Sequence, residues 1–478
     1  MFFFLVLALF FSLPNYSKND VPVVFSKDRE LVDLLLPKED FFPEEIKRLI
    51  AQDIPRSKAA PESLPEWTFL VYMEADNDLI SFASKNLAAM TEAAGSPNFN
   101  LIIQMNRPKE KKLYRLKVES GKLYDVGSLS QYMGKDPETE VFDAVSWCSK
   151  SYPSKYFGLV FWNHGGGIIE RSKQIWLNSF DSSATPVDAA SRSEFEDLRK
   201  RGILYNDTFH SFLSTEAMTR LMQKIRVSLC RKLDFLGMDA CLMAMMEIAF
   251  AIRDSVRVMV GSENVELGDG WNYKEILNQV SKCSGRLTPE ELAKVVVSAY
   301  EAYYLQKDPK FSQSVVYLDR IDTLKDKLNE FVLEFLALRF TNKDIAQSIF
   351  ESMFSSRYLI SFGNDYVDIC SFCDALNFAI AKYLNYGFKH FSSTSQHEII
   401  CRMINISQKL NAIKECVNGV VYSSSCGLNH PNIKGLTIYL PNVLKMVPNA
   451  HYFTSDFARN SLWTGFLSFD MSEKLFDL

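Results

Sequence analysis

The chain has 478 residues, 47% of them hydrophobic and 23% charged, so it can hold two or three domains with a sizeable core. Its formal net charge is −5 and its pI is about 5.8, and no long Lys/Arg stripe is present, which argues against a nucleic-acid-binding protein. The nine cysteines are scattered and odd in number, which does not fit a disulfide framework.

The first residues are strongly apolar. Residues 1–11 fit the core of a signal peptide but are too short to span a bilayer. We therefore expect residues 1–20 to be a signal peptide, and the protein to be secreted or placed in the cell envelope or periplasm. No Lys or Arg precedes this core and no Ala-x-Ala site follows it, so a mis-assigned start, or a hydrophobic end that docks on the fold, is the alternative. No other segment is long and apolar enough for a membrane helix.

We expect residues 21–66 to form a pro-segment or an exposed arm, and the ordered fold to begin at Trp67. In chain order, the pattern predicts a strand at 68–73, an acidic turn at 74–78, a helix at 79–94, a strand at 100–105, a hairpin of 113–118 with 122–126, and a helix at 141–149. It then predicts a strand at 157–162, a helix at 214–229, a strand at 233–238, a helix at 242–253, and strands at 257–261 and 314–318. Strands that alternate with helices indicate an α/β fold, with a mostly parallel sheet sandwiched by helices.

The last third of the chain is mainly helical. Helices are predicted at 320–340, 343–355, 366–385 and 396–414, and strands at 419–422 and 435–440. We expect a catalytic domain of residues 67–320 and a smaller α-rich C-terminal subdomain of residues 321–478. Cys370 and Cys373 have CxxC spacing, but they lie in a predicted helix and no second pair exists. Buried helical cysteines are therefore favoured over a redox or zinc site.

Residues 168–204 interrupt the alternation. They show no sustained periodicity and are rich in Ser, Asp, Ala and Arg. A structureless loop of this length inside a domain is usually functional or disordered. A simple surface insertion is the other interpretation.

Two of the predicted strands end close to reactive side chains. The strand at 157–162 is followed by His164, and the strand at 233–238 by Cys241. Buried parallel strands read as such apolar runs, and open α/β sheets carry their chemistry at the strands' carboxyl ends. If the two strands are neighbours, an imidazole and a thiol meet at one edge, which suggests a Cys/His nucleophile pair.

A cysteine protease needs a thiol that can lose its proton, an imidazole nearby and N–H donors for the oxyanion. Cys241 precedes the helix predicted at 242–253, whose N-terminus would favour the thiolate. The glycines after His164 leave the Gly165 N–H open to a substrate carbonyl, and Asp239 could line the mouth of the pocket. Taken singly, Cys241 could be a core residue, His164 could end a strand and Asp239 could be a helix N-cap. Their combination favours catalysis.

Residues 162–167 (WNHGGG) and 238–243 (MDACLM) resemble the two catalytic motifs of the clostripain family of cysteine peptidases. This family belongs to the caspase-like clan, with gingipains, legumains and separase. Further similar segments follow in the family's order, at residues 70–79, 261–263, 269–273 and 435–441. The resemblance covers residues 67–320, and 320–445 more loosely, and it implies a caspase-like fold.

The resemblance also implies a mechanism. Cys241 would attack, His164 would protonate the leaving amine, and the N–H groups of Gly165 and Cys241 would form the oxyanion hole. Protein or peptide substrates would be cleaved after Arg or Lys, with Asp239 and Asp269 as the acids of the S1 pocket. A carboxylate in a partly desolvated pocket selects a cationic side chain by charge pairing.

No cofactor is implied. Some family members depend on calcium, and the acidic turn at residues 76–78 offers carboxylates, but a solvated turn is favoured and no metal is claimed. Family members are often activated by self-cleavage between the His and the Cys. The basic residues of the insertion that could serve are Lys173, Arg192, Arg199, Lys200 and Arg201.

Two other functions compete with this interpretation. Residues 164–167 also resemble the oxyanion loop of α/β-hydrolase esterases, but the Gly-x-Ser-x-Gly nucleophile elbow of that class is absent from the sequence. A non-catalytic relative could keep the fold for binding or secretion. The intact His164, Cys241 and Asp239 argue against it.

Overall fold

The computed structural model describes residues 50–51, 64–93, 95–107, 112–130, 133–168, 202–363, 365–386, 393–442 and 448–468. They belong to one compact unit that extends from Phe41 to Leu478. The predicted signal peptide and nearly all of the predicted pro-segment lie outside the described residues, as do residues 169–201 of the insertion.

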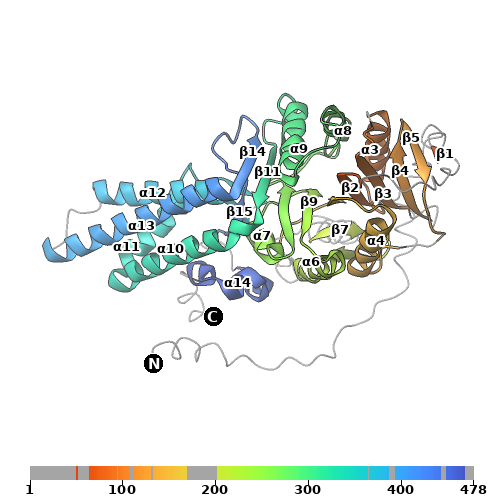
Figure 1. The fold of residues 1–478 in the computed structure, drawn as a ribbon. Coiled ribbons are helices and arrows are strands. Elements are labelled where there is room, and N and C mark those ends of the chain that lie inside the picture. The colour runs from red at the N-terminus through yellow and green to blue at the C-terminus, as the bar shows by residue number, and fades with distance from the viewer. Residues whose placement is uncertain are drawn as a thin grey trace, which may run out of the picture. The chain divides into compact units, whose positions relative to one another are not determined.

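A ten-stranded sheet forms the centre of this unit (Figure 1). Its strand order is β1 (Ile50–Ala51), β5 (Lys122–Asp125), β4 (Lys112–Glu119), β3 (Phe99–Arg107), β2 (Trp67–Glu74), β6 (Tyr156–Trp162), β9 (Leu233–Asp239), β10 (Val256–Gly261), β11 (Ser312–Tyr317) and β14 (Val421–Cys426). The five central strands, β3, β2, β6, β9 and β10, are parallel to one another. On one side, β4 and β5 continue the sheet with antiparallel pairings, and on the other side β11 and β14 do the same. The predicted α/β fold with a mainly parallel sheet is confirmed.

Helices cover both faces of the sheet (Figure 1). In β2, Phe69 and Val71 pack into a core with α3 (Ile80–Glu92), α8 (Tyr273–Lys282) and α9 (Pro289–Tyr304). Leu70 and Tyr72 point the other way, into a second core with α4 (Pro137–Ser151), α6 (Thr215–Leu229) and α7 (Met246–Ile252). Because successive strand residues alternate between faces, a strand that is apolar throughout must be covered on both sides.

The later part of the chain adds four long helices to the second core. They are α10 (Ile321–Thr341), α11 (Lys343–Phe354), α12 (Ile369–Tyr386) and α13 (Ser393–Val420). The shorter helical segments of the described chain include η2 (Leu318–Arg320), η4 (Ala450–Thr454), α14 (Asp456–Asn460) and α15 (Trp463–Leu467). A small sheet is formed by β12 (Ser361–Phe362), β13 (Tyr366–Asp368) and β15 (Thr437–Tyr439), and a hairpin by β7 (Ile203–Asn206) and β8 (Ser211–Leu213).

Two predictions in this part need correction. The helix predicted at 366–385 begins only at Ile369, because residues 366–368 pair with β12 and β15 as strand β13. The strand predicted at 419–422 begins only at Val421, because residues 419 and 420 end α13, and as β14 it continues to Cys426 along the edge of the main sheet. Cys370 and Cys373 are buried in α12 with free thiols, as expected, and burial raises the pKa of both.

Candidate active site

The strands that precede His164 and Cys241 are neighbours. β6 and β9 are parallel, and their last paired residues are Trp162 and Asp239. The Asn163 N–H then donates to the Asp239 carbonyl over 3.3 Å. His164 and Cys241 therefore leave the sheet at the same edge, each two residues beyond this pair, as the sequence predicted.

The His164 loop is fixed by buried hydrogen bonds. The Asn163 amide donates to the Glu74 carbonyl at 2.6 Å and accepts from the Tyr205 N–H at 2.7 Å. The Tyr366 hydroxyl of β13 donates to the Gly166 carbonyl at 2.8 Å. Three separate segments thus hold the backbone on both sides of His164.

Gly165 lies directly against Cys241. A Cβ atom at residue 165 would meet the Cys241 carbonyl oxygen at 2.2 Å and the Cys241 nitrogen at 3.1 Å, so no larger residue fits. The backbone N–H groups of Gly165 and Cys241 both lower the pKa of the Cys241 thiol, which places them near its sulfur. These are the two donors that the sequence assigns to the oxyanion hole.

The helix predicted at 242–253 is wrong at its start, since α7 begins at Met246. Leu242 has a left-handed φ of 62°, and its N–H donates to the Asn264 carbonyl instead of opening a helix. Cys241 therefore does not lie at a helix N-terminus, and the dipole argument for its thiolate fails. Asp239 is not an N-cap either, because Met245 holds that position.

Burial dominates the state of the thiol. It raises the pKa of Cys241, and the negative charge of Asp239 raises it further. The Glu266 N–H donates to Sγ at 3.3 Å and opposes this shift. The resting sulfur is therefore a thiol, and its attack on a substrate requires a base.

His164 has a partner that the sequence interpretation missed. Its Nε2 lies 2.7 Å from Oδ1 of Asp78, whose side chain is half exposed. The acidic turn is not the solvated turn that was predicted, because Asp76 and Asn77 are buried. The signal was available, since Asp78 follows the β2 strand and β2 is the sheet neighbour of the His-bearing strand.

Asp239 lies two residues before Cys241, and its side chain is almost fully buried. It is 5% exposed and accepts hydrogen bonds from the Trp271 N–H at 3.1 Å and the Tyr273 hydroxyl at 2.7 Å. Burial raises its pKa to about 6. Its carboxyl group also contacts that of Glu266, whose pKa is raised well above the usual value by burial and by the Asp239 charge. Glu266 was not predicted as a site residue.

Asp269 lies nearer the surface, on the loop that also carries Glu266. Its side chain is 42% exposed, 3.9 Å from Lys85 Nζ, and accepts from the Tyr303 hydroxyl at 2.9 Å. The negative charges of Asp239, Glu266 and Asp269 all raise the pKa of Tyr304. The structure thus groups the three acids around one tyrosine, with Asp269 partly exposed and Asp239 buried.

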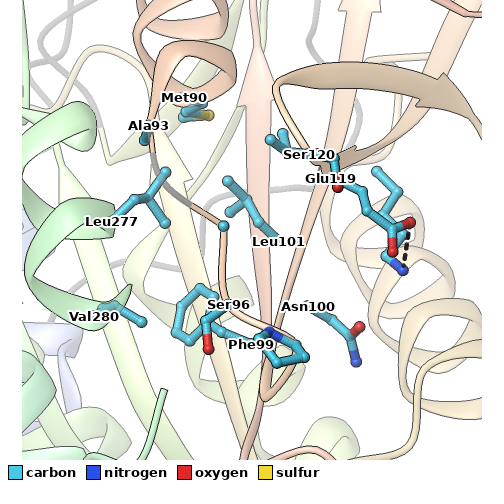
Figure 2. Close-up of a pocket in the computed structure, with 14 residues that line it drawn as sticks. Met90, Ala93, Ser96, Phe99, Asn100, Leu101, Glu119, Ser120, Leu277 and Val280 are labelled. Atoms are coloured by element: carbon cyan, nitrogen blue, oxygen red, sulfur yellow. Dashed lines mark hydrogen bonds and ion pairs between the residues drawn. The ribbon is translucent and has the colours of Figure 1, made fainter. Parts of the chain in front are cut away.

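A cavity of about 290 Å³ lies away from this site, near the amino ends of β2 and β3. Figure 2 shows the side chains that line it. Met90, Phe99, Leu101, Leu277 and Val280 line it. Phe99 pairs with Trp67 at the amino ends of β3 and β2, whereas His164 and Cys241 follow carboxyl ends. The cavity therefore takes no part in the chemistry of the His164 and Cys241 side chains.

The part of the chain that the structure describes offers neither a metal cluster nor a membrane helix. Within those ranges, no group of three or more His, Cys, Asp or Glu side chains could hold a metal ion. No helix among them is long and apolar enough to cross a membrane.

Comparison with known proteins agrees with this geometry. The model of the clostripain family matches residues 71–185 and 188–473. The chain belongs to the clostripain family. Clostripain of Hathewaya histolytica is 24% identical over 266 residues, a match that spans about half of each protein: 49% of this chain and 46% of clostripain.

Two solved structures share the fold of this clostripain-family protein. A secreted C11 cysteine protease from Bacteroides thetaiotaomicron, bound to an irreversible peptide inhibitor, superposes with a TM-score of 0.55 at 16% identity, covering 83% of this chain and 99% of that one. An inactive zymogen of a C11 protease from Parabacteroides distasonis superposes with a TM-score of 0.53 at 19% identity, covering 84% and 99%. The predicted family and fold are therefore confirmed.

Proposed function

We propose that this protein is a cysteine endopeptidase that cleaves protein or peptide substrates after Arg or Lys. The observation that carries the proposal is the close contact of Gly165 with the backbone of Cys241, at the edge where His164 leaves the sheet. Membership of the clostripain family supports the same chemistry.

The reaction follows from these groups. His164 takes the Cys241 thiol proton as the sulfur attacks the scissile carbonyl carbon, and the resulting oxyanion accepts hydrogen bonds from the two N–H groups. The imidazolium then gives its proton to the leaving amine, and the C–N bond breaks to leave an acyl-enzyme. Water, deprotonated by His164, attacks the thioester, and the acid product and the free thiol are released.

The preference for a cationic P1 side chain follows from the acidic pocket. A guanidinium or ammonium group entering past the partly exposed Asp269 would meet the buried Asp239 carboxylate. In a site shielded from water, such a charge pair is much stronger than at the surface. A neutral P1 side chain would leave the buried carboxylate without a cationic partner.

Self-activation and export are further parts of the proposal. The relative from Parabacteroides distasonis is described as a zymogen and that from Bacteroides thetaiotaomicron as secreted, which supports both. Cleavage at one of Lys173, Arg192, Arg199, Lys200 or Arg201 would open the chain between His164 and Cys241. Mass spectrometry of active protein tests this, since an uncut segment in a fully active sample would contradict the requirement. N-terminal sequencing of the mature protein tests removal of the leader.

The direct test uses fluorogenic peptide amides that differ only at P1. We expect release from the Arg and Lys amides, little release from the Leu and Asp amides, and none from any amide after Cys241→Ala or His164→Ala. Activity that survives Cys241→Ala would refute the nucleophile. A folded wild-type protein that cleaves none of the amides before or after processing would indicate a binding protein.

A further inference from the structure

Glu266 occupies an unusual position between the nucleophile and the S1 acid. Its backbone N–H donates to the Cys241 sulfur at 3.3 Å, and its side chain contacts the Asp239 carboxyl group. The Gln313 amide of β11 donates to Glu266 Oε1 at 3.2 Å and fixes the orientation of the carboxyl group. The other oxygen, Oε2, is buried and accepts no hydrogen bond.

Two carboxyl groups in contact cannot both be charged at low cost, because like charges in a desolvated site repel strongly. One proton held between them removes the repulsion and turns the undonated Oε2 of Glu266 into a donor to Asp239. Within the described part of the chain, neither Asp239 nor Glu266 forms an ion pair with a lysine, arginine or histidine. The pair therefore lacks a resident cation that could replace the proton.

The other titratable groups that face this pair cannot supply a positive charge. They are the Cys241 thiol and the hydroxyls of Tyr273, Tyr300 and Tyr304, from α8, α9 and the turn after β9. Each of these groups is neutral or negative, and the charges of the carboxyl pair raise the pKa of all four. Among the described residues, therefore, no group supplies a positive charge to this pair.

We propose that Glu266 is a second specificity residue of the S1 pocket: it shares one proton with Asp239 in the empty enzyme, and a cationic P1 side chain replaces that proton. This proposal rests on the proposed Arg/Lys specificity and names the acid that completes it. On binding, the proton leaves to solvent and both carboxylates become charged against the P1 cation. The exchange keeps the charge of the pocket unchanged, at one negative charge before binding and two negative charges plus one cation afterwards.

Proton release is measured directly by titration calorimetry in buffers of different ionisation enthalpy. The full-length Cys241→Ala protein, which cannot cleave, is titrated at about pH 7, above the Asp239 pKa of about 6, with an Arg-P1 peptide and with the same peptide carrying citrulline, its neutral isostere. We expect release of a substantial fraction of one proton with the Arg peptide and none with citrulline. Binding of the Arg peptide without proton release would overturn the proposal and leave the proposed function intact.

Substitution provides a second readout. Glu266→Gln keeps the backbone N–H to Cys241 but removes the second charge, and we expect kcat/KM for Arg substrates to fall about tenfold, mainly through KM. The KM of the variant should keep only the pH dependence of the Asp239 carboxyl group, near about pH 6, because the second titrating carboxyl group is gone. Far-UV circular dichroism identifies a variant that does not fold, in which case the calorimetry decides.

Two controls separate the outcomes. Glu351→Gln changes an exposed glutamate of α11 and should alter neither readout. If wild-type protein shows no preference for Arg over citrulline, the proposed function fails. If it shows that preference and Glu266→Gln leaves KM and its pH dependence unchanged, only the role of Glu266 fails.

Discussion

At the scale of single residues, the site combines a thiol whose pKa is raised with an imidazole that has a carboxylate partner. Burial and the Asp239 charge raise the pKa of the Cys241 thiol, so a bare thiolate is not the resting nucleophile. The Asp78 carboxylate lies 2.7 Å from Nε2 of His164, where it can fix the ring and stabilise the imidazolium that forms on proton transfer. We therefore expect Asp78 to act through His164 as a positioning residue.

Asp78→Asn tests this role. Because Asp78 is half exposed, solvent screens the interaction, and we expect kcat to fall about tenfold with KM little changed. Asp78→Glu should recover part of the loss, since it restores the charge. Steady-state kinetics on an Arg amide give both constants, and Asp326→Asn, at an aspartate 63% exposed, is the matched control. A tenfold rise in KM at constant kcat would place Asp78 in substrate binding instead.

At the scale of elements, two short irregular segments build the site between regular ones. The loop after β6 and the turn after β9 touch at Gly165 and Cys241. The turn is held on its other side, where the Ala244 N–H donates to the Ser262 carbonyl at 2.9 Å and the Thr437 N–H to the Ala244 carbonyl at 2.9 Å. β15 therefore supports the catalytic turn from nearly two hundred residues away in sequence.

Gly165→Ala tests the contact between these segments. The new Cβ would meet backbone atoms that cannot rotate away, so the His164 loop must shift from Cys241. Since a misplacement of about 1 Å can cost about a hundredfold in rate, we expect a loss of kcat/KM of that size or more. Gly95→Ala is the control, because its nearest neighbour would lie 3.9 Å away. A Gly165→Ala protein with wild-type kinetics would mean that the two segments are not in contact.

The regular elements were predictable because buried parallel strands are apolar throughout and their helices are periodic. The adjacency of β6 and β9 followed from the same pattern. The turn from Leu242 to Met245 was not predictable, because its residues are good helix formers. The N–H groups of Leu242 and Ala244 donate instead to the carbonyl groups of Asn264 and Ser262, which lie in another loop. Glu266 was missed for the same reason, since only the folded loop brings its carboxyl group to Asp239.

At the scale of the whole molecule, buried acids join the main sheet to the C-terminal elements. Glu247 of α7 accepts from the Tyr439 N–H of β15 at 2.9 Å and from the Tyr452 hydroxyl at 3.0 Å. Glu263, just after β10, accepts from the Gly435 N–H at 2.9 Å and contacts Asp368 of β13. These contacts connect α7 and the end of β10 to β13, β15 and the residues just before β15.

Glu247 makes stability depend on pH. Burial raises its pKa from 4.5 to about 7, so the folded protein holds this proton more tightly than the unfolded chain. The contribution of Glu247 to the unfolding free energy is fully present below about pH 4.5. It is lost as the pH rises through about 7, by about 3 kcal/mol in total. Glu247→Gln keeps an acceptor for both donors without a charge. It should therefore raise the unfolding free energy at about pH 8 relative to wild type, and much less at about pH 5.

Urea unfolding of both proteins at the two pH values checks this difference. Glu351→Gln, at an exposed position, should follow the wild type at both. If Glu247→Gln changes the unfolding free energy by the same amount at both pH values, Glu247 does not titrate on unfolding.

The role of Cys241 as the nucleophile is tested most directly with a peptidyl-arginine chloromethyl ketone. Tandem mass spectrometry maps the residue that this reagent modifies. The chain offers nine cysteines, so the reagent has to choose among them. We predict one adduct, on Cys241, that is lost in His164→Ala and is not formed when citrulline replaces the arginine. An adduct on another cysteine, or labelling of Cys241 that is the same with citrulline, would contradict it.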